Sequence, residues 1–365
     1  MSETIRRDYA PDFVSAPGET LEEVLEMHGM SQAQLAERTG RPKKTINEIV
    51  KGKAGITPET ALQFELVLGT PAAFWTSREQ QYRDALARSK EIESLGTQAS
   101  WLERIPHRAM VKMGWLREEH QKAKQLEQVL RFFGVASPER WNQLWQGQQA
   151  AFRRSPTFES DPGAVAAWLR KGEIEAQKIQ CAEYNSARFK EALRYVRKLT
   201  RELPPDFASL VVRECSAAGV RVVFVPELPG TRAWGATRWL SATSALIQLS
   251  LRYKTDDHLW FTFFHEAGHT LLHGKREYFL EGEDQERNTK ESEADSFALE
   301  WLIPQKEYTV FRRLGARSCG AIRRFAYQLG IAPGIVVGRL QHDGALARNQ
   351  CNDLKKKIGW TDTIE

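Results

Sequence analysis

Three histidines and a glutamate occur together in one short apolar stretch, FTFFHEAGHTLLHG, at residues 261–274. His265 and His269 are four residues apart, so on a helix they share one face about one turn apart. Two imidazoles placed in this way can bind one Zn²⁺ ion. Glu266, the next residue after His265, can stand beside the metal site as a general base. The spacing therefore predicts a hydrolytic zinc centre in which Glu266 is catalytic.

The third histidine, His273, is not expected to bind the same ion. Eight residues of straight helix would place it about 12 Å from His265, which is too far for the three side chains to share one metal. The six-residue spacing to a third histidine that metzincins use is also missing, because position 275 is lysine. We expect His273 to pack or to hydrogen-bond below the site.

An acidic segment further along the chain, ESEAD at residues 291–295, offers the missing protein ligand. Glu291 and Asp295 are four residues apart and share a helix face, whereas Glu293 points elsewhere. This spacing suits one of these two carboxylates on zinc and the other as a group that orients a ligand histidine. Two histidines, one glutamate and an open position for water make a hydrolytic zinc site.

The alternative interpretation of this motif is a surface helix that carries histidines by chance. The apolar run LWFTFFHEAGHTLLH argues against it. Polar side chains within such a run would be partly buried and would need partners. We therefore keep the zinc centre as the prediction.

A second motif, SQAQLAERTG followed by RPKKTINEIVKGK at residues 31–53, has the pattern of two helices joined by a tight turn. Gly40 permits the turn, and the apolar seam between the helices is formed by Leu35, Ala36, Ile46 and Ile49. In a helix-turn-helix domain, the first residues of the second helix reach base edges in the major groove. The alternative is a small helical bundle whose lysines are only solvated.

On the helix-turn-helix interpretation, polar residues of this segment contact a double-stranded DNA operator. Lys43 and Lys44 can address guanine or phosphate, and Glu48 can accept a hydrogen bond from cytosine. Gln32, Lys51 and Lys53 suit phosphate contacts. The predicted DNA-binding residues are Gln32, Lys43, Lys44, Asn47, Glu48, Lys51 and Lys53. We also expect a homodimer, because two copies double the phosphate contacts.

The segments around the two motifs predict an α+β multidomain protein. Residues 1–78 read as five short helices of an all-α helix-turn-helix domain, and residues 79–203 as a helical connector or scaffold. Residues 204–312 contain the β-rich segments VRVVFVPEL, RAWGATRWL and SALIQLSLR, which predict a small antiparallel sheet before the motif helix. Residues 313–365 are helical and basic.

The C-terminal stretch LGIAPGIVVGRLQ leaves two interpretations open. It has the outline of a second helix-turn-helix, with Arg323, Arg324 and three lysines at 355–357 nearby. We favour a packed helical extension of the preceding domain with a solvated basic face.

Composition narrows the class of protein. The chain has 365 residues, 41% of them hydrophobic, and a net charge of +5, which permits nucleic-acid contact without requiring it. The first residues, MSETIRRDYA, lack the apolar core of a signal peptide, and no segment approaches the ~20 apolar residues of a membrane span. The four scattered cysteines, Cys181, Cys215, Cys319 and Cys351, indicate reduced thiols and no disulfide framework. We therefore expect a cytoplasmic protein that binds no membrane.

Two segments resemble known families. WFTFFHEAGHTLLHG followed by ESEADSFALEWLIP resembles the ImmA/IrrE family of bacterial zinc metallopeptidases, and the resemblance extends over about residues 205–310. It implies a zincin-like α+β peptidase domain with His265, His269 and Glu291 on zinc and Glu266 as the catalytic base, and a repressor-like protein as substrate. The ImmA/IrrE resemblance also implies a role in mobile elements or stress responses. Residues 17–75 resemble XRE-type repressors, specifically the HigA-like antitoxin group, which implies a role in toxin–antitoxin systems.

Together these features predict a bacterial, DNA-binding transcriptional regulator with a gluzincin-like metalloendopeptidase domain. It would cleave a repressor- or antitoxin-type protein, or itself. The alternative is a non-proteolytic, antitoxin-like repressor whose peptidase fold acts as a sensor or binds a partner.

Overall fold

The computed structural model describes residues 15–152, 161–275, 277–282, 289–315 and 318–359. The chain divides into two compact units, of which the first comprises Met1–Ala99 with Gln121–Lys124 and the second Ser100–His120 with Gln125–Glu365. The N-terminal stretch in which we found no signal-peptide core lies outside the described residues. None of the described helices combines the length and apolar character that a membrane span requires.

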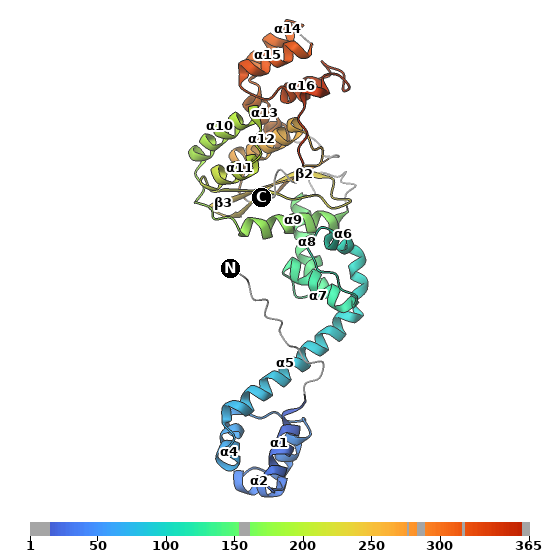
Figure 1. The fold of residues 1–365 in the computed structure, drawn as a ribbon, viewed down its shortest axis with the longest axis vertical. Coiled ribbons are helices and arrows are strands. Elements are labelled where there is room, and N and C mark those ends of the chain that lie inside the picture. The colour runs from blue at the N-terminus through green and yellow to red at the C-terminus, as the bar shows by residue number, and fades with distance from the viewer. Residues whose placement is uncertain (1–14, 153–160, 276, 283–288, 316–317, 360–365) are drawn as a thin grey trace. The chain divides into compact units, whose positions relative to one another are not determined.

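The first unit is a bundle of five helices (Figure 1). Their bounds are α1 Pro17–Met27, α2 Gln32–Thr39, α3 Lys43–Val50, α4 Pro58–Leu68 and α5 Ala72–Thr97. Ser31 caps α2 because its hydroxyl accepts from the Gln34 amide (3.3 Å) while its own amide donates to the Gln34 side chain (2.9 Å). Gly40 then ends α2 with a φ of 68°, the left-handed conformation that favours glycine.

The predicted seam between α2 and α3 is confirmed. Leu35 and Ile46 are fully buried, and Ala36 and Ile49 nearly so. They pack with α1 and α4 around Phe64 and Trp75, whose rings meet edge to face at 5.5 Å.

Helix α5 differs from the short fifth helix that we predicted. It runs for 26 residues to Thr97 and passes through position 78, where we placed a domain boundary. No proline or glycine interrupts the chain between Pro71 and Gly96, so nothing in the local sequence ends the helix earlier. The domain boundaries at 78, 203 and 312 remain predictions.

The second unit is built around a four-stranded sheet in the order β1-β3-β2-β4. The strands are β1 Val220–Phe224, β2 Ala233–Ser241, β3 Ser244–Leu249 and β4 Phe279–Gly282. β2 is antiparallel to both β3 and β4, but β1 runs parallel to β3, so the prediction of an antiparallel sheet is wrong at this pair. The reason is that β3 folds back from β2 as a hairpin and inserts between β2 and β1.

Helices cover both faces of this sheet (Figure 1). α9 (Pro162–Gln177) packs on one face, and α11 (Phe207–Ser216) and α12 (Asp256–Leu272) pack on the other. Trp168 of α9 donates from Nε1 to the Val225 carbonyl (2.9 Å), and Gln248 of β3 donates to the Trp168 carbonyl (2.7 Å). Because both faces are covered, β3 is buried along its whole length, and so is most of α12, which carries the HEAGH motif.

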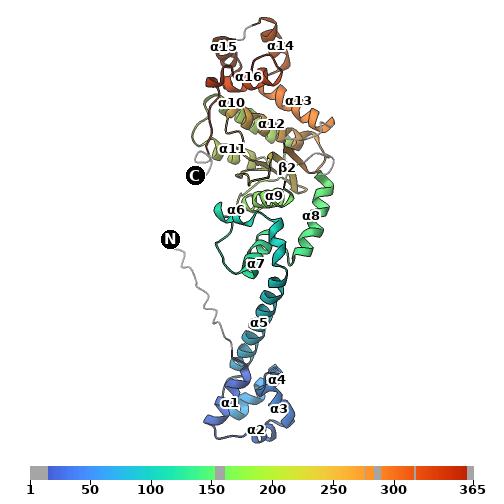
Figure 2. The same cartoon turned by 90° about the vertical axis from the view of Figure 1, so that its right-hand side faces the viewer.

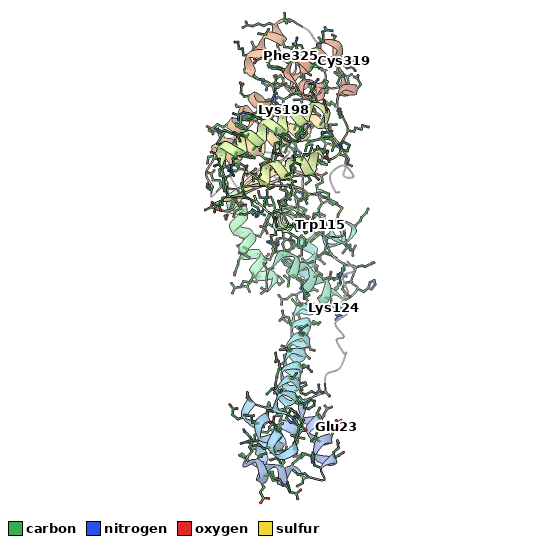
Figure 3. All side chains as sticks on the ribbon, turned by 60° about the vertical axis from the view of Figure 1, so that its left-hand side comes forward. Glu23, Trp115, Lys124, Lys198, Cys319 and Phe325 are labelled. Carbon is green, nitrogen blue, oxygen red and sulfur yellow. A yellow bond between two sulfur atoms is a disulfide. The ribbon has the colours of Figure 1, made fainter. Side chains whose placement is uncertain are left out.

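The remaining helices complete the second unit. On the N-terminal side these are η1 Ala99–Arg104 and α7 Lys122–Phe133, whose first residues belong to the first unit, together with α6 His107–Lys112, α8 Pro138–Phe152 and α10 Ser186–Glu202. On the C-terminal side they are α13 Thr289–Leu302, α14 Gln305–Arg313, α15 Cys319–Leu329, α16 Pro333–His342 and η2 Asn352–Leu354 (Figure 2). Phe325 of α15, labelled beside Cys319 in Figure 3, stacks on Phe311 of α14 with ring centroids 4.2 Å apart.

Helix α16 bears on the two interpretations of the C-terminal stretch. It packs on α12, with Ile335, Val336, Val337 and Leu340 buried, and none of its residues from 333 to 340 is exposed. A recognition helix needs an open face for the major groove, and residues 333–340 are all buried or half-buried, whereas His342 at the end of α16 is exposed. This packing supports the interpretation of a packed helical extension, which stays a prediction.

The prediction of four reduced thiols is wrong for two of the cysteines. Cys319 and Cys351 form a disulfide across a Cα–Cα distance of 5.6 Å, whereas Cys181 and Cys215 are free. The two bonded residues are 32 positions apart and meet only because α15 and α16 fold back on each other.

Candidate metal centre and nucleic-acid face

Two neighbouring helices bring the predicted metal ligands together. α12 supplies His265 and His269, and α13 packs alongside it and supplies Glu291. The two Nε2 atoms are 3.0 Å apart, and Glu291 Oε2 lies 3.1 Å from His265 Nε2 and 3.3 Å from His269 Nε2. All three side chains are buried.

This triangle of atoms fits a zinc ion. Ligand atoms about 2.0–2.1 Å from a tetrahedral zinc stand about 3.3 Å from one another. The three measured separations of 3.0, 3.1 and 3.3 Å are of this size. Each of the three residues thus offers one ligand atom close to the other two, and the set suits one divalent ion.

The residues around the triangle orient its histidines. Asp295, one turn after Glu291 on α13, accepts from His265 Nδ1 at 2.9 Å, as predicted for a carboxylate outside the ligand set. His273 lies beyond the triangle: its Nδ1 is 2.9 Å from Nδ1 of His269, and its Nε2 is 3.0 Å from the Glu293 carboxylate. The expectation that His273 hydrogen-bonds below the site is confirmed.

The electrostatics of the triangle favour a bound cation. Burial raises the pKa of Glu291, but hydrogen bonds with His265 and His269 outweigh it and hold that pKa at about 2. Burial lowers the pKa of His269 to about 4, so its imidazole is neutral near pH 7, as a metal ligand must be. Burial also lowers the pKa of His265, but the charge of Glu281 and the carboxylates of Asp295 and Glu291 raise it well above its usual value. Surroundings that attract a proton in this way also attract a metal ion.

Glu266 lies on the sheet side of α12. Its side chain is fully buried, and neither carboxylate oxygen has a hydrogen-bond partner among the described residues. Burial raises its pKa well above the usual value of a glutamate. A Cβ atom added to Gly235 of β2 would stand 2.4 Å from Glu266 Oε1, so the missing side chain of Gly235 makes the room that Glu266 occupies. A carboxyl group with unused oxygens and a raised pKa suits proton transfer.

Sequence reasoning missed one acidic residue of the centre. Glu281 of β4 is buried, and one of its oxygens can lie within 4.8 Å of ligand atoms of His265 and Glu266. Burial raises its pKa to about 6. Phe279, two residues earlier on the same strand, stacks on His269 with centroids 3.9 Å apart. Because side chains alternate along a strand, Phe279 and Glu281 lie on the same face of β4. The strand spans only four residues and was not predicted.

The predicted DNA contacts lie on and around α3 in the first unit. Lys43, Lys44, Lys51 and Lys53 are exposed, whereas Gln32, Asn47 and Glu48 are half-buried. Lys44 and Glu48 form a surface ion pair at 3.8 Å, and Gln32 contacts Glu22 at 3.4 Å. Four of the seven residues are thus open to a phosphate backbone.

Comparison with known proteins identifies the first unit. Residues 21–75 match a family model described as Helix-turn-helix. A solved structure described as an addiction module antidote protein of a HigA family from Coxiella burnetii is 31% identical, with a TM-score of 0.21, and the match covers 22% of this chain and 90% of that chain. No curated protein matches the chain. The chain therefore carries an XRE-type helix-turn-helix, a DNA-binding motif, at its N-terminus.

Proposed function

We propose that this helix-turn-helix regulator is also a zinc metalloendopeptidase that cleaves a repressor- or antitoxin-type protein. The observation that carries the proposal is the triangle of His265 Nε2, His269 Nε2 and Glu291 Oε2, with sides of 3.0, 3.1 and 3.3 Å. The resemblance of residues 205–310 to the ImmA/IrrE family supports the same reaction and the class of substrate.

In this proposal, each polar residue of the centre has one task. His265, His269 and Glu291 hold the zinc, and Asp295 holds His265 in the orientation that presents Nε2. Zinc held by these residues would polarise the scissile carbonyl and would lower the pKa of a bound water to about 7. Glu266 takes the water proton on a carboxylate oxygen and then returns it to the amine nitrogen of the leaving peptide.

The test of this activity uses zinc-loaded full-length chain and repressor proteins encoded near it. We expect one of these to be cut at a defined bond, as detected by mass spectrometry, and the cut to disappear when a chelator removes zinc. Zinc-loaded chain that cuts none of these repressors and no member of a peptide library would support the alternative, a non-proteolytic regulator whose peptidase fold senses or binds a partner. Self-cleavage within residues 79–100 would require local unfolding, because α5 is helical from Ala72 to Thr97.

Gly235→Ala is expected to lower the cleavage rate about 100-fold without loss of zinc, since displacement of a catalytic group by about 1 Å can cost this much. The added methyl would overlap Glu266 Oε1 and Thr262, whereas no metal ligand is among its nearest atoms. Gly96→Ala is the matched control, because nothing lies within 4 Å of its added Cβ. Steady-state cleavage and zinc content of both variants are measured. An unchanged rate in Gly235→Ala would mean that Glu266 does not need its present position.

The helix-turn-helix half of the proposal concerns an operator. Removing both charges in Lys43→Ala/Lys44→Ala is expected to weaken operator binding. It should also lower the slope of log Kd against the logarithm of salt concentration by up to about 2 per chain. The control Arg88→Ala/Lys90→Ala removes two exposed charges from α5 instead and should bind as the wild type does. Fluorescence anisotropy at several salt concentrations checks this. Equal salt slopes for both variants would exclude Lys43 and Lys44 from the interface.

A second copy of the chain is part of this proposal. Leu62 and Leu66 lie four residues apart on α4 and expose 56% and 85% of their area, so the first unit carries an apolar strip on its surface. A homodimer that covers this strip would double the phosphate contacts. The mass of the full-length chain in solution, measured by light scattering, tests it.

A further inference from the structure

We propose that Cys319 and Cys351 form a reversible thiol–disulfide site that reacts with low-molecular-weight thiols and disulfides. Residues 352–358 are here called the C-terminal strap. The redox state of the two cysteines decides whether this strap stays bound to the first turn of α12. This inference concerns the second unit alone and does not depend on whether the chain cleaves proteins.

The strap pairs with the chain just before and at the start of α12. The Asp256 amide donates to the Lys356 carbonyl (3.0 Å), and the Ile358 amide donates to the Lys254 carbonyl (2.9 Å). Between these two bonds, Thr255 and Lys357 form an antiparallel bridge. The strap therefore acts as a short extra strand that holds the entry to the helix of the metal centre.

Charged groups at this contact make its separation costly. Lys355 Nζ lies 2.6 Å from Asp257 Oδ2, and both side chains are largely buried. Asp256 is completely buried, and one of its oxygens accepts from the Lys356 amide at 3.0 Å. Since an unpaired buried carboxylate is strongly unfavourable, release of the strap must also loosen the first turn of α12.

Helix α16 contacts the same two aspartates from another side. A Cβ added to Gly334 would stand 2.5 Å from Asp256 Oδ1, and one added to Gly338 would stand 2.7 Å from Asp257 Oδ2. The start of α12 is thus enclosed by α16 and by the strap. Helix α16 and the strap both follow Cys319 in the sequence, so the disulfide can control the position of each.

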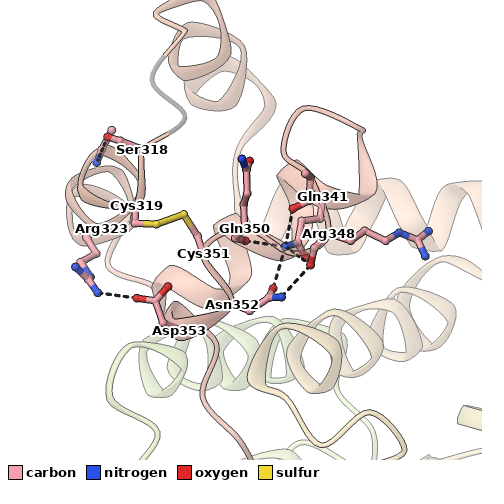
Figure 4. The surroundings of a disulfide bond; sticks show 11 residues. Ser318, Cys319, Arg323, Gln341, Arg348, Gln350, Cys351, Asn352 and Asp353 are labelled. Atoms are coloured by element: carbon pink, nitrogen blue, oxygen red, sulfur yellow. Dashed lines mark hydrogen bonds and ion pairs between the residues drawn. A yellow bond between two sulfur atoms is a disulfide. The ribbon is translucent and has the colours of Figure 1, made fainter.

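The disulfide joins the two ends of this enclosure (Figure 4). Cys319 is the first residue of α15, and Cys351 directly precedes the strap, so the bond closes a loop that contains α15 and α16. The other ties shown there are weaker: Arg323 pairs with Asp353 at 3.2 Å on the exposed surface, and Gln341 donates to the Gln350 carbonyl and to Asn352. The cystine is the covalent link between α15 and the strap, and it acts beside the burial of Leu354 and Ile358 in the core of the second unit.

The cystine is accessible to small reagents. Both cysteines are half-buried, and both line an open hollow of about 950 Å³ together with Gln341, His342 and Arg348. A small thiolate can attack one cystine sulfur, form a mixed disulfide and release the other cysteine as thiolate; a second thiolate then releases the first cysteine and leaves as the small disulfide. The reverse pair of exchanges consumes one small disulfide and restores the bond.

The DNA-binding unit provides an independent reason for reversibility. A helix-turn-helix domain works in the compartment that holds DNA, where thiol systems keep most cysteines reduced. Disulfides that form in such compartments are usually transient or redox-sensing. Cys215, by contrast, is fully buried and has no bonded partner, so it is not part of this chemistry.

Hydrogen exchange on the full-length chain, oxidised and then reduced with dithiothreitol, tests the proposal. We expect the amides of Asp256 and Ile358 to exchange at least about tenfold faster after reduction, because their hydrogen bonds depend on the seated strap. The amides of the β1·β3 ladder, such as Val222, should not change. Thiol alkylation and mass spectrometry confirm the redox state of each sample.

Two variants separate this effect from general unfolding. Cys351→Ser should show the fast exchange with or without reductant, and Cys181→Ser should respond to reductant as the wild type does. If Cys351→Ser fails to fold, the comparison of oxidised and reduced wild type decides alone. The proposal is overturned if reduced chain keeps its slow exchange at Asp256 and Ile358, or if the cystine stays closed in a glutathione buffer strongly biased to the thiol form.

Discussion

Glu266→Gln is expected to lower the rate of peptide-bond cleavage by about 10²–10⁴-fold while zinc stays bound, since this is the usual contribution of a general base. Glutamine has nearly the same shape as glutamate but cannot take a proton. Glu266 is not one of the three residues whose atoms form the ligand triangle, and its own oxygens have no hydrogen-bond partner among the described residues. The substitution thus removes the proton acceptor and leaves His265, His269 and Glu291 in place.

The measurement combines zinc content with single-turnover cleavage of the identified repressor. Glu307→Gln, the same change at an exposed residue of α14 in the same unit, is the control and should cleave at the wild-type rate. Full cleavage by Glu266→Gln would show that another group takes the proton. Glu281 would then be the next residue to test, because it is a buried carboxylate near His265 that lies outside the ligand triangle.

His269→Ala and His273→Ala are expected to differ sharply, although both remove a buried imidazole from the end of α12. His269 supplies one corner of the triangle, so its loss should reduce zinc from about one ion per chain to nearly none. His273 contacts the far nitrogen of His269, the Glu293 carboxylate and the ring of Phe279, and none of these contacts is with the ligand atom Nε2 of His269. Its loss should weaken zinc binding by about 10–100-fold, which is typical of a residue that orients a ligand.

Elemental analysis after desalting, followed by zinc titration against a chelator, distinguishes the two variants. At saturating zinc, His273→Ala should bind one ion, and His269→Ala should not. Equal loss of zinc in both variants would mean that His273 takes part in coordination. Equal retention of zinc by both variants would contradict the proposed metal centre. Operator binding by the first unit would be unaffected.

Much of the local structure follows from the amino-acid sequence. The turn between α2 and α3 depends on Ser31 and Gly40, which act on backbone groups within a few residues of themselves. The shared faces of His265 with His269 and of Glu291 with Asp295 follow from four-residue spacing on a helix. The prediction of a packed C-terminal extension rested in the same way on local pattern.

The tertiary structure alone decided what these local pieces build. Glu291 meets His265 across 26 positions of sequence because α13 packs on α12, and Gly235 meets Glu266 because β2 lies beneath the same helix. Glu281, the parallel pairing of β1 with β3 and the bond between Cys319 and Cys351 could not be read from spacing. Local backbone geometry repeats with a fixed period and can be read along the chain, whereas contacts between distant segments depend on how whole helices and strands pack.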